Sequence, residues 1–439
     1  MSDLLAARSQ MAMSLAFHIV FAAVGIAMPL LMLIAEGLWL RTRRPVYLDL
    51  AKRWARGTAI MFAVGAVSGT VLSFELGLLW PTFMRHAGPV VGMPFSLEGF
   101  AFFTEAIFLG IYLYGWNRVP ERAHWLAGLA VLVSGTLSGV FVVTANAWMN
   151  TPAGFDFVDG RFVNVRPFQA MLNPAAFSEV LHSTLAAFLA IGTAVAGIHA
   201  ARLYRDPRNP FHRAAFAIAL AVMGGAAILQ PLAGDIAARH VARYQPVKLA
   251  AMEAQWETES SAPLRIGGWP SEAREETRWS LEIPGALSLM AFGDRSAEIT
   301  GLKTVPPELR PPVLITHLAF QVMVGIGFLL PALALLGGVL AWRARGLPEA
   351  RWYFRLLALA TPTGLVALEA GWVVTEVGRQ PWIVAGFLKT AEAVTPMPWL
   401  VVPFLAFTAL YLLLGVVVLV LMWRHVLAIP SATAFPGEA

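Results

Sequence analysis

Residues 401–422 have the sequence VVPFLAFTALYLLLGVVVLVLM, in which no side chain is charged. A run of about 20 apolar residues is long enough to cross the hydrocarbon core of a bilayer as a helix. Comparable runs recur along the chain of 439 residues, of which 58% are hydrophobic and only 13% are charged. Since about a quarter of the residues are charged in an ordinary soluble domain, this composition indicates a membrane protein.

The hydropathy pattern predicts an all-α, polytopic membrane protein with nine transmembrane helices. No internal repeat is evident, which argues against an inverted-repeat transporter. We therefore expect residues 1–439 to form a single membrane domain. The predicted spans are residues 11–40, 57–80, 95–117, 124–148, 175–203, 212–234, 312–342, 353–377 and 400–425.

Basic residues are distributed unequally over the segments that connect these spans. Seventeen Lys and Arg residues fall on one side of the predicted membrane, against six in the short segments of the other side. The positive-inside rule then predicts that the N-terminus is outside and the C-terminus cytoplasmic. Asp3 and Arg8 precede the first apolar run, and no small-residue cleavage site follows it, so we expect no cleavable signal peptide.

The longest connection is the polar segment 235–310, which is predicted to lie on the outer side. Its 76 residues hold 11 of the 27 acidic residues. A loop of this length in a compact protein is usually either functional or disordered. Within it, residues 248–259 contain helix formers that place Lys248, Met252 and Trp256 on one side, and this pattern alone favours a solvated amphipathic helix.

The chain contains no cysteine. This excludes disulfides, thiolate-bound iron–sulfur clusters and covalently attached c-type haem. A bound metal must therefore be held by His, Met, Glu or Asp. The net charge of +5 is explained by the basic residues that gather on one predicted side of the membrane. We therefore interpret it as a topology signal and do not expect binding to nucleic acid.

Four side chains that can bind iron fall in the outer half of the predicted membrane. At 1.5 Å per residue, His18 and His182 lie ~10 Å from the outer ends of their spans and Met323 ~16 Å, while Glu376 lies at the outer end of its span. A lone His in a membrane helix can equally hydrogen-bond a neighbouring helix, and a lone Met is usually a packing residue. A His–Met pair is nevertheless a known six-coordinate haem pairing suited to electron transfer.

Residues Glu369-Ala-Gly-Trp-Val-Val-Thr-Glu-Val-Gly-Arg-Gln-Pro-Trp382 concentrate polar groups at the end of the eighth span. Glu369 and Glu376 are seven residues apart and project from one helix face. Gly378 and Pro381 are expected to end the helix. Spacing alone leaves two alternatives at even weight, namely an ion pair of Glu376 with Arg379 that caps the helix, or a functional site.

The third span contains a second pair of acidic residues on one face, Glu98 and Glu105. Carboxylates that follow one another down a span are typical of a proton relay. The alternative is that each acid is simply paired or protonated. Glu75 also lies at membrane depth, and the sequence assigns no role to it.

Several short motifs resemble subunit I of the cytochrome bd quinol oxidases, in the same order along nearly the whole chain. They are Leu97-Glu-Gly99, Ala145-Asn146 with Trp148-Met149, Lys248-Leu-Ala-Ala-Met-Glu253, Met323-Val-Gly325 and Gly378-Arg-Gln-Pro-Trp382.

The resemblance implies three haems near the outer face. His182 and Met323 match the axial ligands of a low-spin haem b. His18 and Glu376 match ligands of a high-spin haem b and a haem d, or of a third haem b in place of haem d, and which residue serves which haem stays open.

Two further matches concern the surroundings of the haems. Arg379 would face a haem propionate, for which its guanidinium can form a bidentate contact. Trp372 would lie beside the haems.

The same resemblance implies a function. Quinol, either ubiquinol or menaquinol, would be oxidised at the outer loop 235–310 by Lys248 and Glu253, and O2 would be reduced to water with cytoplasmic protons that pass Glu98 and Glu105. This would generate a proton motive force without pumping. A second membrane subunit is implied, with a small single-helix subunit as an option, and the location would be the bacterial cytoplasmic (inner) membrane.

The chain departs from the family pattern in two places. Its outer loop is short, as in the branch that includes cyanide-insensitive oxidases, and Gln321 stands where many relatives carry Arg. Two other classes of membrane protein agree less well with the sequence. A di-haem electron-transfer subunit would show paired His on two helices, which is missing, and a proton-coupled transporter is disfavoured because the His, Met and Glu residues cluster on one side.

Overall fold

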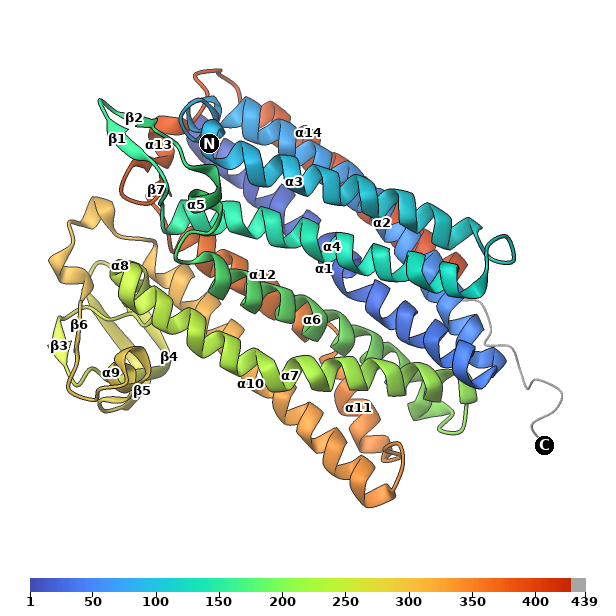
Figure 1. Cartoon of the computed structure of the whole chain (residues 1–439). Coiled ribbons are helices and arrows are strands. Elements are labelled where there is room, and N and C mark those ends of the chain that lie inside the picture. Colours follow the sequence, from blue (N-terminus) through green and yellow to red (C-terminus); the bar gives the residue numbers. More distant parts are fainter. Residues whose placement is uncertain (428–439) are drawn as a thin grey trace.

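The computed structural model describes residues 1–427 and contains, within that part of the chain, nine helical segments long and apolar enough to cross a membrane (Figure 1). The predicted all-α architecture with nine spans is confirmed. The spans are α1 (Asp3–Thr42), α2 (Pro45–Leu79), α3 (Pro81–Tyr114), α4 (Glu121–Asn150), α6 (Ala176–Arg205), α7 (Pro210–Tyr244), α10 (Val313–Ala344), α11 (Arg351–Ala360) with α12 (Thr363–Val377), and α14 (Val401–Met422) with its π-helical continuation η3 (Trp423–Leu427).

Several helices extend beyond the predicted spans. Helix α1 begins eight residues before the predicted position 11, α3 begins at Pro81 instead of 95, and α7 continues to Tyr244 instead of ending at 234. The segment that was predicted to be a loop from residue 235 therefore starts as helix. The difference arises because hydropathy detects the part of a helix that matches the bilayer, whereas the backbone hydrogen bonds continue into its polar ends.

The eighth span is interrupted. Helix α11 ends at Ala360, and α12 starts at Thr363 after Thr361 and Pro362. Proline has no backbone N–H and its ring clashes with the preceding turn, which explains a break at this position. Because of this break, α12 is a separate helix that begins at Thr363, and Glu376 lies near its C-terminal end.

Helix α6 packs closely against α7, α11 and α12, because glycines at the crossings let the backbones approach. A Cβ atom added to Gly192 of α6 would lie 2.9 Å from the backbone nitrogen of Met223 in α7. A Cβ atom on Gly364 of α12 would lie 2.6 Å from the Cα atom of Ala190 in α6. These contacts fix the three helices that carry the candidate site relative to one another.

Short elements gather at the end of the bundle that also holds the N-terminus (Figure 1). All sheets within residues 1–427 are two-stranded and antiparallel. The strand pairs are β1 (Asp156–Val158) with β2 (Arg161–Val163), β3 (Glu259–Ser260) with β6 (Glu298–Ile299), β4 (Leu264–Ser271) with β5 (Glu276–Ile283), and β7 (Trp382–Val384) with β8 (Leu388–Lys389). The short helices are α5 (Pro167–Met171), α8 (Pro246–Met252), α9 (Ala286–Phe292), α13 (Thr390–Ala393), η1 (Leu302–Thr304) and η2 (Pro307–Leu309).

The prediction of a solvated amphipathic helix over 248–259 is wrong. Helix α8 ends at Met252, and Lys248, Met252 and Trp256 are all at least 94% buried. Tertiary contacts cause this burial. The indole N–H of Trp256 donates to Thr277 at 3.0 Å, and α8 packs against α10 and α7. A pattern of helix formers cannot reveal that the rest of the loop covers the helix.

The glycine contact between α6 and α7 leads to a stability prediction. The substitution Gly192→Ala should destabilise the protein by about 1–3 kcal/mol, because the added methyl group meets the backbone of α7 and forces the helices apart. The measurement is thermal unfolding of the purified protein in detergent.

Gly224→Ala is the matched control. Gly224 also lies in a membrane helix, but nothing lies within 4 Å of its added Cβ atom. The gain in helix propensity is therefore the same and the steric cost is missing. Equal unfolding temperatures for the two variants would contradict the close approach of α6 and α7.

Candidate functional site

The carboxylate of Glu376, in the last turn of α12, is the centre of a partly buried polar cluster. Arg379 donates to one of its oxygens at 2.5 Å, and the side-chain amide of Asn146 in α4 donates to the other. Arg379 is 5% exposed, and its Nε and Nη1 atoms are buried without a hydrogen-bond partner. The predicted Glu376–Arg379 ion pair is present. Its Arg379 partner is buried and keeps two guanidinium donors available, whereas the Glu376 side chain is 28% exposed.

Lys248 from α8 joins this cluster from the outer loop. Its ammonium group donates to Asn150 in α4 at 2.6 Å, and the Asn150 amide donates in turn to Asn146 at 3.1 Å. Burial lowers the pKa of Lys248, whereas the charges of Glu179 and Glu376 oppose that shift. A chain of hydrogen bonds thus leads from the loop lysine to the Glu376 carboxylate.

A cavity of about 270 Å³ borders this chain of hydrogen bonds. Lys248, Asn150, Arg379 and Trp382 are among the side chains that line it. An apolar cavity with a few convergent polar groups is typical of a small-molecule site. The cavity has both an ammonium and a guanidinium group for an oxygen-bearing ring, and Trp382 offers an aromatic surface.

Glu253 lies apart from this cavity. It directly follows α8, is 3% exposed, and is not among the residues that line the cavity. Burial raises its pKa to about 8, an effect that Arg265 partly opposes, and its Oε2 atom has no hydrogen-bond partner. A carboxyl group with a pKa near the working pH can accept and release a proton.

His182 lies in α6 and Met323 in α10, and α12 packs against both of these helices. The side-chain amide nitrogen of Gln230 in α7 lies 3.3 Å from Nδ1 of His182. A Cβ atom added to Gly371 of α12 would lie 3.1 Å from the sulfur of Met323. Gly371 therefore leaves the space that the Met323 thioether uses, and the partly buried Trp372 follows it directly in α12.

His18 occupies a separate place between α1 and α2. Its Nδ1 atom lies 2.9 Å from the Ser68 hydroxyl, which also lies 3.0 Å from the Val64 carbonyl oxygen. Because a hydroxyl has one hydrogen, donation to Val64 leaves the Ser68 oxygen to accept from Nδ1–H, so that Nε2 keeps its lone pair. A Cβ atom added to Gly69 would come within 3.0 Å of the ring, which is thus held against the α2 backbone.

Glu98 and Glu105 lie on the face of α3 that packs against α4. Ser138 of α4 donates to Glu98 at 3.4 Å. Glu105 is 5% exposed, and Cβ atoms added to Gly25 in α1 or Gly135 in α4 would meet its carboxylate at 3.5 and 3.0 Å. Small residues from two helices therefore make room for this acid.

Four polar partners in these sites were not among the residues predicted from the sequence: Glu179, Asn150, Gln230 and Ser68. Glu179 could have been noticed, because it lies three residues before His182 and so shares its helix face. The other three are single neutral polar residues, and their sequence positions do not reveal which helix they face.

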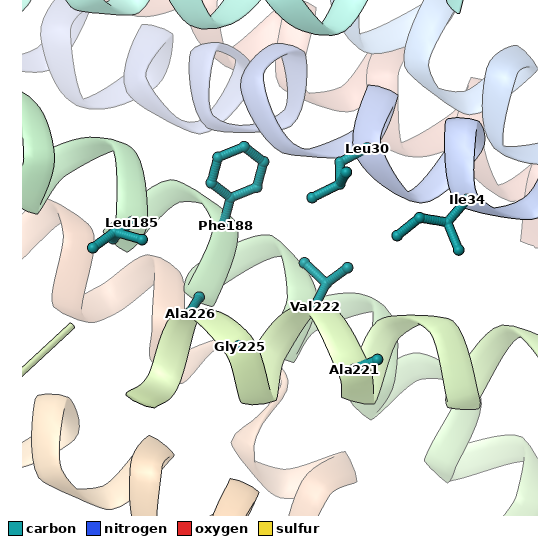
Figure 2. A pocket seen from close by; sticks show the side chains of 8 residues that line it. All are labelled: Leu30, Ile34, Leu185, Phe188, Ala221, Val222, Gly225 and Ala226. Carbon is teal, nitrogen blue, oxygen red and sulfur yellow. The ribbon is translucent and has the colours of Figure 1, made fainter. Parts of the chain in front are cut away.

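A second cavity, of about 350 Å³, lies between α1, α6 and α7 (Figure 2). Leu30 and Ile34 line it from α1, Leu185 and Phe188 from α6, and Val222 and Ala226 from α7. Every lining side chain is apolar. Because it offers no side-chain donor or acceptor, it is less suited than the Lys248 cavity to hold a polar head group.

Haem fits the residues that these sites contain. The unpaired Nε and Nη1 donors of Arg379 suit a propionate, Gly371 and Gly69 leave room for the Met323 sulfur and the His18 ring, and each Glu376 oxygen keeps a lone pair after its hydrogen bond. No group of three or more His, Cys, Asp or Glu residues able to hold a metal ion occurs in residues 1–427. Candidate ligands spread over separate helices are what irons with one or two axial ligands require.

Nine apolar helical segments within residues 1–427 define a multi-pass membrane protein. The model of the family "Cytochrome bd terminal oxidase subunit I" matches residues 6–430, and the chain belongs to this family. It is thus subunit I of a cytochrome bd-type quinol oxidase, an oxidoreductase.

Relatives support this conclusion over the full chain. The solved structure of the bd oxidase from Geobacillus thermodenitrificans has a TM-score of 0.91 and 38% identity, and the match covers 98% of this chain and 99% of that chain. The cytochrome bd ubiquinol oxidase subunit 1 of Bacillus subtilis (strain 168) is 33% identical, with 97% of this chain and 94% of the relative covered. A second protein of that organism, named for menaquinol, is 37% identical, with 95% of each chain covered.

The raised pKa of Glu253 predicts a pH-dependent stability. Between its ordinary value of 4.5 and the folded value of about 8, the folded state holds a proton that the unfolded state has released. Stability from this group is therefore complete below pH 4.5 and is lost as the pH rises towards 8. The variant Glu253→Gln should show a smaller fall in unfolding temperature across this interval than the parent protein, and identical pH profiles would contradict the buried, protonated state.

Proposed function

We propose that the enzyme oxidises quinol at the outer side, in the cavity bordered by Lys248, and reduces O2 to water with protons drawn from the cytoplasm. The observation that carries this proposal is the hydrogen-bonded chain from Lys248 through Asn150 and Asn146 to Glu376. It joins a cavity for a small ring to a candidate iron ligand. Since the quinol protons leave outside and the water protons come from inside, a proton motive force would arise without pumping.

His182 and Met323 would hold a low-spin haem b, and His18 and Glu376 the irons of a high-spin haem b and a haem d, or a third haem b in its place. When bound, the haems supply electron transfer and the binding of oxygen. Arg379 would hold a propionate with the guanidinium donors that Glu376 leaves unpaired. Ser68 would orient His18 so that Nε2 is the free ring nitrogen.

At the quinol cavity, Lys248 would donate a hydrogen bond to a quinol oxygen, and its ammonium charge would favour the loss of the quinol proton. Glu253 would accept that proton. Since Glu253 does not line the cavity, this transfer needs an intermediate such as water, and the two residues are best tested separately. On the other side of the molecule, Glu98 and Glu105 would pass protons along the contact of α3 with α4.

The same proposal includes the setting of the chain. The N-terminus would lie outside and the C-terminus inside, in the bacterial cytoplasmic membrane, with segment 235–310 as the quinol-binding loop. A second membrane subunit, with or without a small single-helix subunit, would cover part of the apolar surface. Candidate surfaces are provided by α3 and α14, where Phe100, Phe103, Leu412 and Leu419 are between 66% and 72% exposed.

The ligand assignment predicts the selective loss of one haem's absorption signal. His182→Ala or Met323→Leu should remove the low-spin haem signal from the reduced-minus-oxidised absorption spectrum, because each removes one of two axial ligands. His240→Ala is the control, since His240 also lies in a membrane helix and no haem is assigned to it. An unchanged low-spin spectrum in the first two variants would rule out these ligands.

The role of Glu253 predicts a split between two activities. Glu253→Gln should lower quinol turnover by at least 10-fold, as expected for the loss of a general base, while oxygen reduction with an artificial electron donor persists. Glu257→Gln is the matched control on the same loop, because Glu257 is exposed and paired with Lys303. If Glu253→Gln oxidised quinol at the parental rate, Glu253 would not be the proton acceptor.

A further inference from the structure

Glu75, for which neither the sequence nor the proposed mechanism provides a role, lies in a polar cluster between α1, α2 and α14. It is 2% exposed, and one carboxyl oxygen accepts from the Gln10 amide and from the Ser14 hydroxyl, each at 2.9 Å. Tyr411 of α14 is 3% exposed, and its hydroxyl faces Ser14 and Glu75. Three helices thus bring four polar side chains together at a buried place.

Three atoms of this cluster have no hydrogen-bond partner: Oε2 of Glu75, Oε1 of Gln10 and the hydroxyl of Tyr411. A buried polar atom without a partner costs about 1–3 kcal/mol, and such atoms are usually satisfied by protein or by an internal water. A buried water typically forms about three hydrogen bonds to polar groups of this kind. One water could donate to Gln10 and Tyr411 and accept from a protonated Glu75.

The protonation state follows from the surroundings of the carboxyl group. Gln10, Ser14 and Tyr411 are neutral, and no ion pair of Glu75 occurs within the described residues. A buried carboxylate with no cation beside it is costly, so the neutral acid is favoured. The neutral acid also supplies the O–H donor that the water needs.

The cluster continues the faces of α1 and α2 that hold His18. Gln10, Ser14 and His18 are four residues apart in succession, and Ser68 and Glu75 are seven apart, so each set shares one helix face. Ser14 is one turn, or about 6 Å along the axis, from His18. The cluster and the His18–Ser68 contact therefore belong to one polar stripe at the interface of these helices.

We propose that Gln10, Ser14, Glu75 and Tyr411 form a water-binding site that stores one proton on Glu75, one helical turn from His18. The water is the ligand, and the proton is held in the Glu75 O–H bond. This inference concerns a site that the quinol cavity and the Glu98–Glu105 path do not include. Only its link to a haem rests on the proposed function.

The water is tested by a high-resolution cryo-EM map of the purified complex. We expect density for a water in contact with Glu75, Gln10 and Tyr411. A dry cluster, or a side chain of another subunit in the same place, would overturn the water site.

The stored proton is tested by infrared spectroscopy of the same complex at neutral pH. The parent-minus-variant spectrum of Glu75→Gln, a change of nearly equal size, should contain one protonated-carboxyl band that shifts in D2O. Glu121→Gln is the control, because Glu121 is exposed and paired with Arg43 and should give no such band. Tyr411→Phe should shift the Glu75 band through the shared water. The absence of the band, or a band insensitive to Tyr411→Phe, would overturn the site as described.

The link to His18 has a separate readout. Reduction of the complex should shift the Glu75 band, because the charge on an iron one turn away acts through a low-dielectric region. If the band does not shift while His18→Ala removes a haem, the link is wrong and the proposed ligand stands. If His18→Ala leaves the haem content unchanged, the ligand assignment is wrong, whereas the water and its proton are unaffected.

Discussion

The structure around the candidate site depends on the contacts of the partly buried Glu376 carboxylate at the end of α12. An ionised acid that is even partly removed from water needs hydrogen bonds and a counter-charge. Asn146 of α4 and Arg379 supply them, and Lys248 is held within the same electrostatic field by Asn150. These contacts hold α4, α12 and the outer loop together at the candidate site.

The loop that follows α7 is therefore part of the membrane domain's packing. Gln321 of α10 illustrates this: its amide donates to the Arg265 carbonyl at 2.9 Å, and its oxygen accepts from the Gly267 N–H at 3.0 Å. Gln321 thus joins strand β4 to the membrane helix α10, a role that its sequence position did not indicate. Buried His317 contacts the backbone of Met252 and Gly267 in the same way.

Hydropathy predicted the nine spans because the length and apolar character of a membrane helix are local properties. The Glu376–Arg379 pair was also within reach, since residues three apart on a helix lie side by side. The burial of Lys248 and Trp256 could not be predicted, because it depends on which parts of the loop fold over α8. Asn150 was missed because a single neutral polar residue does not reveal which helix it faces, whereas Glu179, three residues before His182, was within reach. Glu253 and Lys248 were predicted to act together in quinol oxidation, although only Lys248 lines the cavity.

The central claim is that this chain carries three haems whose ligands are His18, His182, Met323 and Glu376. The most direct measurement is pyridine haemochrome quantification of the purified complex, combined with its reduced-minus-oxidised spectrum. We expect three haems per copy of this chain, one of them a low-spin haem b. A preparation of intact complex with no haem, or with only two, would contradict it.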